Sequence, residues 1–300
     1  MVAENAQNSS KTLSLILIFR FQFRPRDSSA EPVQHPMSKS LIPAQRRERI
    51  QEYLAASKII SSAELCDMLD VSEATIRRDL EWLEDEGVLT RTHGGAILNQ
   101  RIQLEPEYQQ RANRYPEEKR LIGSAAAGLI EDGDIVFINS GTTTTQLIHQ
   151  IRGGADITVI TNNLSAALEI GDPGFELMLL GGVFQPKSNS VAGGYAIRNL
   201  GQVYASKAFI AVDGITLKYG FTVPSSAEAE VTRLMLERTR GPVSVISDHS
   251  KWGVVSNFEV AKIEDVQRII TDEGLEPLAR GALTARSVEV VIASESLEIV

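Results

Sequence analysis

Polar side chains follow several apolar runs of this sequence, and their types suit the binding of an anionic ligand. Residues 139–145 (NSGTTTT) come directly after the apolar run 135–138 and open a helical pattern. A small, hydroxyl-rich turn at the start of a helix suits a phosphate, because backbone N–H groups point outward there and the helix dipole favours negative charge. Further polar or glycine residues follow apolar runs at 162–163, 181–182, 213–214 and 248–253.

Apolar runs and helical patterns alternate along residues 119–300, which predicts an α/β domain with a mainly parallel, Rossmann-like sheet. The runs alternate little with polar residues, so both faces of the sheet are expected to be covered. Ligands of such sheets bind beyond the carboxyl ends of the strands, where the five polar segments would meet. The expected strands are 135–138, 157–161, 175–180, 207–212, 242–247, 267–271 and 288–293, and the expected helices are 117–130, 143–151, 163–170 and 227–239.

These segments supply one candidate ligand site. The 139–145 turn would hold a phosphate, Asp213 and Asn162 would bind sugar hydroxyls, and Lys251 would neutralise the phosphate or a carbonyl oxygen. Taken alone, the 139–145 turn is as typical of a helix cap as of a ligand site, whereas Asp213 with Gly214 is more often a turn and Lys251 more often a solvated side chain. The prediction therefore depends on the convergence of the five segments. The predicted ligand-binding residues are Asn139, Ser140, Gly141, Thr142, Thr143, Thr144, Asn162, Gly181, Gly182, Asp213 and Lys251.

A smaller helical domain is expected over residues 44–98. Apolar spacing predicts a first helix over 44–56 with arginines on its outer face, and Ser61 with Glu64 forms the capping box of a second helix. Ser72 caps a third helix over 73–86, which stops at Gly87, and 88–98 alternates around Gly-Gly as a hairpin. The residues expected to face the core are Ile50, Leu54, Leu65, Met68, Leu69, Ile76, Leu80 and Leu83.

Two helices joined by a tight turn and followed by a hairpin are typical of a winged helix-turn-helix, whose second helix enters the major groove. Residues 44–98 hold seven Lys and Arg against eleven Asp and Glu, which also fits a helical domain with solvated arginines. Glu81, Glu84, Asp85 and Glu86 lie late in the third helix, however, away from its leading end. The predicted DNA-binding residues are Ser72, Glu73, Ala74, Thr75, Arg77, Arg78, Arg91, His93 and Gly94.

The stretch VSEATIRRDLEWLEDEGVLTRTHGGA, which begins at Val71, strongly resembles the signature of DeoR-type bacterial transcription regulators. The resemblance implies sequence-specific binding to double-stranded operator DNA, usually to repress a sugar-catabolism operon. The segments EEKRLIGSAAAGLIEDGDIVFINSGTTT, VITNNLSAALEI, LMLLGG, AFIAVDGIT, AEAEVTRLMLERT and SDHSKWG resemble the effector domain of the same family, which is similar in fold to phosphosugar isomerases. That likeness implies a phosphorylated sugar as inducer. The family commonly has Asp where Asn139 stands, and an amide cannot act as a charged base.

Composition excludes several other classes of protein. The net charge of −9 argues against a chain-wide nucleic-acid polycation, and no apolar stretch reaches the ~18 residues that span a membrane. The single cysteine, Cys66, excludes a disulfide framework within the chain and a cysteine-based zinc site, and it fits the cytoplasm as a small core residue. The four histidines lie too far apart in sequence to suggest a metal site: His35, His93, His149 and His249. No cofactor is expected.

The expected domains are 44–98 for DNA binding and 119–300 for the effector, joined by a polar linker over 99–118. Residues 1–43 precede them and are expected to be a disordered tail or a start-site extension. Residues 1–36 lack periodicity, and we interpret them as a disordered tail or the product of an upstream start codon rather than a targeting segment.

The leading hypothesis is a transcriptional regulator without enzymatic activity, most simply a repressor, that binds DNA as a homo-oligomer. Symmetric operators favour a dimer or tetramer, because each DNA-binding domain contacts one half-site. The alternative is a phosphosugar isomerase with an accessory DNA-binding domain. In that case Asp213, Glu228 or Glu230 would be the base and Lys251 the electrophile.

Overall fold

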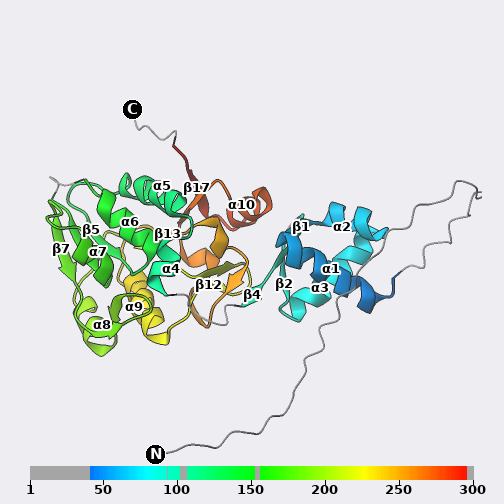
Figure 1. The fold of residues 1–300 in the computed structure, drawn as a ribbon, viewed down its shortest axis with the longest axis horizontal. Coiled ribbons are helices and arrows are strands. Elements are labelled where there is room, and N and C mark those ends of the chain that lie inside the picture. The colour runs from blue at the N-terminus through cyan, green and yellow to red at the C-terminus, as the bar shows by residue number, and fades with distance from the viewer. Residues whose placement is uncertain (1–40, 93, 102–106, 153–155, 296–300) are drawn as a thin grey trace, which may run out of the picture. The chain divides into compact units, whose positions relative to one another are not determined.

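The structure is a computed structural model that describes residues 41–92, 94–101, 107–152 and 156–295. The interpretation of residues 1–36 and the prediction for His93 therefore lie outside the described residues. Figure 1 shows the arrangement of the elements. An N-terminal domain of three helices and a small sheet covers residues 43–98, and a larger α/β domain follows.

The N-terminal domain is built from α1 (Pro43–Ser57), α2 (Ser62–Leu69) and α3 (Glu73–Asp85), with β1 (Ile59–Ser61), β2 (Leu89–Thr92) and β3 (Gly95–Leu98). The strands form an antiparallel sheet in the order β1-β3-β2, and β1 was not expected from the sequence. The predicted capping box is confirmed: the Ser61 hydroxyl accepts from the Glu64 N–H, and the Glu64 carboxylate accepts from the Ser61 N–H. Gly87 ends the third helix with φ of +74°, which glycine adopts without strain.

The core of the N-terminal domain follows the helical spacing with one exception. Ile50, Leu54, Leu65, Ile76, Leu80 and Leu83 are buried, and Leu69 packs against them. The expectation that Met68 faces inward is wrong, because its side chain is 49% exposed. Successive residues of a helix are turned by 100° about its axis, so Leu69 lies about 40° from Leu65 on the buried face. Met68 lies about 60° from Leu65 in the opposite direction, which carries it off that face.

A buried ionic cluster joins the first and third helices. Asp79 is 1% exposed, and its carboxylate accepts hydrogen bonds from the guanidinium groups of both Arg46 and Arg47. The Arg47 guanidinium also lies over the Trp82 ring, 4.3 Å from its centroid. The arginines of α1 were expected on the outer face. Arg46 instead is buried, because its charge is paired with Asp79.

The α/β domain contains the seven expected strands in a single sheet whose strand pairs are all parallel. The order is β17-β16-β13-β10-β5-β6-β7. These strands are β5 (Ile135–Ile138), β6 (Thr158–Thr161), β7 (Glu176–Leu179), β10 (Lys207–Ile210), β13 (Val243–Ile246), β16 (Arg268–Asp272) and β17 (Glu289–Ala293). The chain runs outward from β5 to β7 and then returns to β10 on the other side of β5. The order of strands therefore reverses between β5 and β10, which is where open α/β sheets bind ligands.

Helices cover both faces of this sheet, as the apolar strands predicted. Val136 and Ile138 pack into the cluster beneath α5 (Pro116–Ala127), α6 (Thr142–Gln150) and α7 (Leu164–Glu169). Phe137 points to the opposite cluster beneath α8 (Gly194–Leu200), α9 (Ser226–Glu237) and α10 (Pro277–Thr284). Figure 1 shows α5 and α6 on one side of the strands and α8 and α9 on the other.

Several short elements were not expected from the sequence. They are the helices α4 (Tyr108–Ala112), α8 and α10, the turns η1 (His249–Lys251) and η2 (Ile263–Asp265), the hairpin β8 (Val183–Gln185) with β9 (Ser190–Ala192), the sheet β11 (Gly214–Thr216), β12 (Gly220–Val223) and β15 (Phe258–Ala261), and the pair β4 (Gln100–Arg101) with β14 (Val254–Val255). Helix α4 matters most for the site, because it lies in the segment expected to be a linker.

Replacing Asp79 with alanine tests the buried cluster. The substitution leaves the charges of Arg46 and Arg47 without their carboxylate, so the free energy of unfolding should fall by about 3–5 kcal/mol. Urea unfolding followed by far-UV circular dichroism measures the loss. Asp85→Ala, on the exposed side of the same helix, is the control and should change stability by less than about 0.5 kcal/mol. Equal midpoints for the two variants would contradict the structural role of Asp79.

Candidate functional site

A pocket opens at the carboxyl ends of β5 and β10, where the strand order reverses. It brings together seven of the predicted ligand-binding residues: Asn139, Ser140, Gly141, Thr142, Thr143, Asp213 and Lys251. It also contains residues that the sequence did not nominate as ligands: Arg111, Ser188, Ala211, Val212, Val223, Glu228 and Thr232. Glu228 was considered only as a possible base for the enzymatic alternative. Glu230, considered with it, is exposed outside this pocket.

The turn before α6 is shaped by close packing at Gly141. A Cβ atom on Gly141 would lie 2.8 Å from the Cβ of Ala211, so a larger residue would push the ends of β5 and β10 apart. Thr142 and Thr143 then begin α6 and line the pocket. The first turn of a helix leaves N–H groups without acceptors inside the helix, and the dipole is positive there. The turn can therefore hold a phosphate with both N–H groups and hydroxyls.

The remaining threonines hold the turn itself. The Thr144 and Thr145 hydroxyls both donate to the Gly141 carbonyl at 2.9 Å. The Asn163 side-chain amide donates to the Thr145 hydroxyl at 2.9 Å and to the Gly141 carbonyl at 3.2 Å. Thr144 was among the predicted ligand residues, but its side chain is fully buried and does not line the pocket.

Asn139 bridges two strands with its side chain. Its amide nitrogen donates to the Ala211 carbonyl at 2.9 Å, and its oxygen accepts from the Ala211 N–H at 2.7 Å. Asn139 lines the pocket, yet these bonds engage both ends of its carboxamide. A carboxylate at this position could accept the N–H but could not donate to the carbonyl. The amide therefore suits the two-strand bridge.

Three other predicted ligand residues lie outside the pocket lining. Asn162 is buried and donates to the Val191 carbonyl at 3.0 Å and to the Ser140 hydroxyl at 3.5 Å. Its side chain therefore holds the 139–145 turn through Ser140 and does not line the pocket. Gly182 packs against the backbone of Ala192, where β8 and β9 pair. Gly181 lies beside it at the start of that hairpin.

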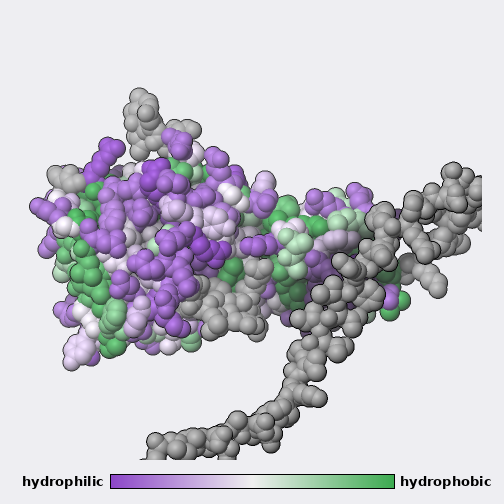
Figure 2. Space-filling view, in the orientation of Figure 1, coloured by the Kyte–Doolittle hydropathy of each residue, from purple (hydrophilic) through white to green (hydrophobic). Residues whose placement is uncertain are grey.

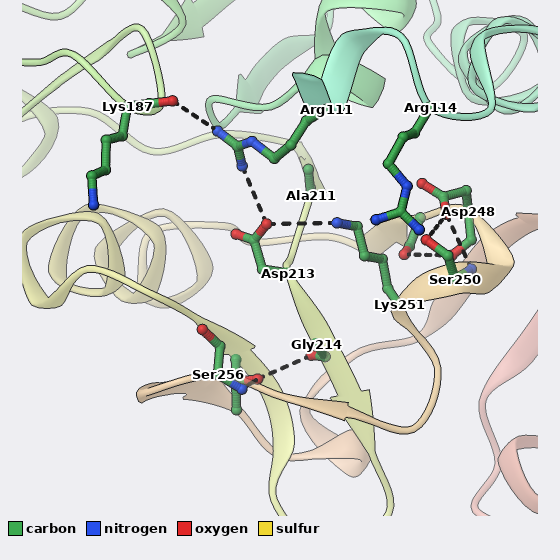
Figure 3. Close-up of polar contacts among 12 residues, drawn as sticks. Arg111, Arg114, Lys187, Ala211, Asp213, Gly214, Asp248, Ser250, Lys251 and Ser256 are labelled. Carbon is green, nitrogen blue, oxygen red and sulfur yellow. Dashed lines mark hydrogen bonds and ion pairs between the residues drawn. The ribbon is translucent and has the colours of Figure 1, made fainter. Parts of the chain in front are cut away.

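A charged cluster forms one wall of the pocket (Figure 3). The Asp213 carboxylate is 3.2 Å from the Arg111 guanidinium and 3.7 Å from the Lys251 ammonium. Arg111 also donates to the Lys187 carbonyl at 3.4 Å. Arg111 was not among the predicted ligand residues, because α4 has five residues and is too short to show a helical period. The nearest available signal was the spacing of Tyr108 and Arg111, which places both on one face of a helical turn.

The Lys119 side chain binds the backbone at the C-terminal end of α4. This side chain is only 4% exposed, and its ammonium donates to the backbone carbonyls of Arg111 and Arg114. Burial lowers the pKa of Lys119 to about 8; the Asp248 carboxylate opposes that shift, and the cations Lys251, Arg111 and Arg114 add to it. Lys119 thus fixes the backbone that carries Arg111 into the pocket.

The leading end of α3 presents the predicted DNA-binding residues. Ser72, Glu73, Ala74, Arg77 and Arg78 are exposed, and the half-buried Thr75 shares a 3.0 Å hydrogen bond with the Ser72 hydroxyl. Arg91, in β2, is held against α3 by Glu84 at 2.7 Å and lies 3.8 Å from Glu81. Gly94 is half-buried before β3. The two arginines of α3 are therefore the cations most open to a DNA groove among these residues.

Comparison with known proteins identifies both domains. A model of the DeoR C terminal sensor domain matches residues 114–273, and a model of the DeoR-like helix-turn-helix domain matches residues 46–101. The chain belongs to the DeoR family. Members of this family are DNA-binding transcriptional regulators, and so is this chain. Both the winged helix-turn-helix resemblance and the Rossmann-like fold expected from the sequence are thereby confirmed.

Individual relatives align with most of this chain and with most of their own length. The chain is 34% identical to the uncharacterized HTH-type transcriptional regulator YulB of Bacillus subtilis, over 83% of this chain and 96% of YulB. It is 35% identical to the HTH-type transcriptional repressor GlcR of the same organism, over 76% of this chain and 88% of GlcR. Among solved structures, ribose 5-phosphate isomerase A from Methanocaldococcus jannaschii aligns with a TM-score of 0.34 at 14% identity, over 46% of this chain and 54% of that one.

The described residues contain no group of three or more histidine, cysteine or acidic side chains placed to hold a metal ion. The same part of the chain includes no helix long and apolar enough to cross a membrane. Cys66 is half-buried in α2, and burial raises the pKa of its thiol, with the Glu73 and Asp67 carboxylates adding to the effect.

Replacing Lys119 with methionine tests the buried ammonium. The pKa of Lys119 is about 8 in the folded chain, against about 10.4 in an unfolded one. Between these values the unfolded state binds more protons, so the cost of burying the charge disappears as pH rises. The wild type should therefore gain melting temperature relative to Lys119→Met between about pH 7 and about pH 10.

Scanning calorimetry at each pH measures this difference between the two chains. Lys187→Met is the matched control, because the Lys187 side chain is exposed and only its backbone carbonyl contacts Arg111. The control should show no such pH-dependent gap. A gap between wild type and Lys119→Met that stays constant with pH would show that burial does not shift the titration of Lys119.

Proposed function

We propose that this DeoR-family regulator is a repressor of a carbohydrate-catabolism operon, and that a phosphorylated sugar controls its binding to operator DNA. The observation that carries the proposal is the pocket at the switch point, where a helix N-terminus and the cluster of Asp213, Arg111 and Lys251 face the same space. Residues 44–98 would bind the operator and residues 119–300 the effector. The protein would act in the cytoplasm, where the DNA lies.

The pocket's polar groups divide according to the two parts of a sugar phosphate. The first turn of α6, with the hydroxyls of Thr142 and Thr143, suits the phosphate. The carboxylates of Asp213 and Glu228 are acceptors that suit sugar hydroxyls. Lys251 and Arg111 carry the positive charge that a dianion requires, and Asp213 pairs with both.

This pairing gives the effector a way to act. A phosphate attracts Lys251 and Arg111 and competes with Asp213 for them, so occupancy favours a different arrangement of this wall. Arg111 lies in α4, which begins ten positions after β3 ends at Leu98. A change at Arg111 is therefore passed to the segment of chain that leads into the DNA-binding domain. The effector shifts DNA binding only as far as it binds the two arrangements with different affinities.

The DNA contact would use α3 in the major groove. Its leading end carries Arg77 and Arg78, which can bind phosphates or donate two parallel hydrogen bonds to guanine. One domain reads one half-site, so a symmetric operator requires at least two copies. We therefore propose a homo-oligomer, a dimer or a tetramer.

The enzymatic alternative has one observation in its favour: Asp213, Glu228 and Lys251 line the same pocket, as an isomerase base and electrophile would. The family's named relatives are transcriptional regulators, which favours regulation over catalysis. A coupled isomerase assay on the full chain with pentose and hexose phosphates separates the two. Turnover that disappears in Asp213→Asn would support the enzyme.

Replacing both Arg77 and Arg78 with alanine tests DNA binding. Each arginine that reads a guanine contributes about 1–3 kcal/mol, so operator affinity should fall at least about tenfold. Gel shifts on the promoter region of the chain's own operon measure the loss at moderate salt. Arg49→Ala is the control, because Arg49 is exposed on α1 and pairs with Glu52. Failure of the wild type to shift any neighbouring promoter would overturn the proposed function.

Effector control is tested in the same complex. Fluorescence anisotropy of labelled operator would follow release by pentose and hexose monophosphates, with inorganic phosphate as a comparison. Lys251→Met and Arg111→Met should each require about tenfold more sugar phosphate, because each removes a charged hydrogen-bond donor. Lys187→Met should respond like the wild type, since its exposed side chain lies outside the pocket lining. Unchanged release by both pocket variants would locate the effector elsewhere.

A further inference from the structure

Large exposed hydrophobic side chains gather around one edge of the α/β domain. The described part of the chain exposes twelve such side chains, and six of them lie between positions 168 and 195. We name these six the β7 patch: Leu168, Met178, Leu179, Val183, Phe184 and Tyr195, which are 43–73% exposed. They come from α7, β7, β8 and α8: α7 contacts β7, and α7, β8 and α8 each contact β9. Figure 2 shows a hydrophobic band along this side of the domain.

The patch surrounds an open strand edge. β7 is the last strand of the seven-stranded sheet, and β6 is its neighbour in the sheet. Residues 177–184 read LMLLGGVF and contain no charged side chain. Edge strands that face water are usually protected by lysine, proline or a bulge, because a bare edge pairs with other strands. An unprotected, apolar edge of this kind is typical of a strand that another chain covers.

Opposite charges lie at the two ends of this edge. Asp172 and Glu176 are exposed at the amino end of β7. The turn after β7 lies against α8, because a Cβ on Gly181 would be 3.9 Å from the Asn199 amide. Arg198, the residue before Asn199, is exposed and lies over the Tyr195 ring at 4.5 Å. The edge is thus acidic at one end, apolar in the middle and basic at the other.

This charge pattern is complementary to itself when the strand is reversed. Two β7 strands paired antiparallel about a two-fold axis place the acidic end of each beside the basic end of the other, with the apolar residues between them. The same axis pairs the open backbone groups of both edges. A parallel or a displaced arrangement would leave like charges facing each other or the apolar residues in water.

We propose that the β7 patch is the interface through which two copies of this chain form a two-fold dimer, with their β7 strands antiparallel. The inference deepens the proposed function, since the dimer would supply the two DNA-binding domains that a symmetric operator requires. A tetramer would use this interface twice and a second surface besides.

Light scattering coupled to gel filtration tests the interface. The wild type should elute as an even number of chains. Met178→Lys places a charge at the centre of the patch and should raise the dimer dissociation constant about thirtyfold or more. Phe258→Lys is the matched control: Phe258 is 37% exposed in β15, the edge strand of another sheet, and its replacement should leave the mass unchanged. A monomeric wild type, or an unchanged mass in Met178→Lys, would overturn the proposal.

Cysteine cross-linking gives a second test that does not depend on a destabilising charge. The chain has one cysteine, so Cys66→Ser provides a background for single cysteines at Glu176, Leu177, Met178 and Leu179. In a two-fold antiparallel pair only positions next to the axis approach their own copy closely enough for a disulfide. One or two adjacent positions should therefore cross-link under mild oxidation. Equal cross-linking at all four, or at none, would contradict this geometry.

The two proposals fail in different ways. If the wild type binds no neighbouring promoter but the Met178→Lys variant is monomeric, the proposed interface stands and the proposed regulation fails. If the Met178→Lys variant stays oligomeric and the wild type binds its operator, the proposed regulation stands and the proposed interface fails.

Discussion

The hydrogen bonds between the Asn139 carboxamide and the backbone of Ala211 are the contact on which the site depends. β5 and β10 lie on either side of the point where the strand order reverses, and no crossover connects them directly. The Asn139 side chain joins their carboxyl ends with a donor and an acceptor. Gly141 can then approach Ala211, and α6 begins with its first turn facing the pocket. A carboxylate in place of this amide would lose the donor half of the bridge.

The charged side chains that line the pocket balance one another. Asp213 and Glu228 are acidic, and Arg111 and Lys251 are basic. The partial positive charge at the start of α6 is then the part that an anion can use without breaking a pair. A dianion needs more than this, and the nearest additional charges are those already held by Asp213. Binding a sugar phosphate and rearranging the Asp213 pairs are, in the proposed function, the same event.

The strands of the large sheet could be predicted from the sequence, because apolar runs recur along residues 119–300. Seven apolar runs predicted the seven sheet strands, and the polar segment after each of three strands, β5, β10 and β13, does contribute to the pocket. Short elements and side-chain direction could not be predicted. Helix α4 has five residues, so Arg111 appeared to lie in a linker. In the threonine run, only the fold decides that Thr143 faces the pocket while Thr144 donates to Gly141.

The position of α4 in the chain gives Arg111 a second significance. Its backbone is fixed at one end by Lys119, whose buried ammonium binds two carbonyls, while its side chain pairs with Asp213 in the pocket. A helix of five residues has little stability of its own, so these outside contacts determine whether it stays formed. An effector that draws Arg111 away from Asp213 therefore alters the balance of contacts that hold α4. Because α4 follows the DNA-binding domain closely in sequence, the proposed function makes α4 the element that passes occupancy of the pocket on to that domain.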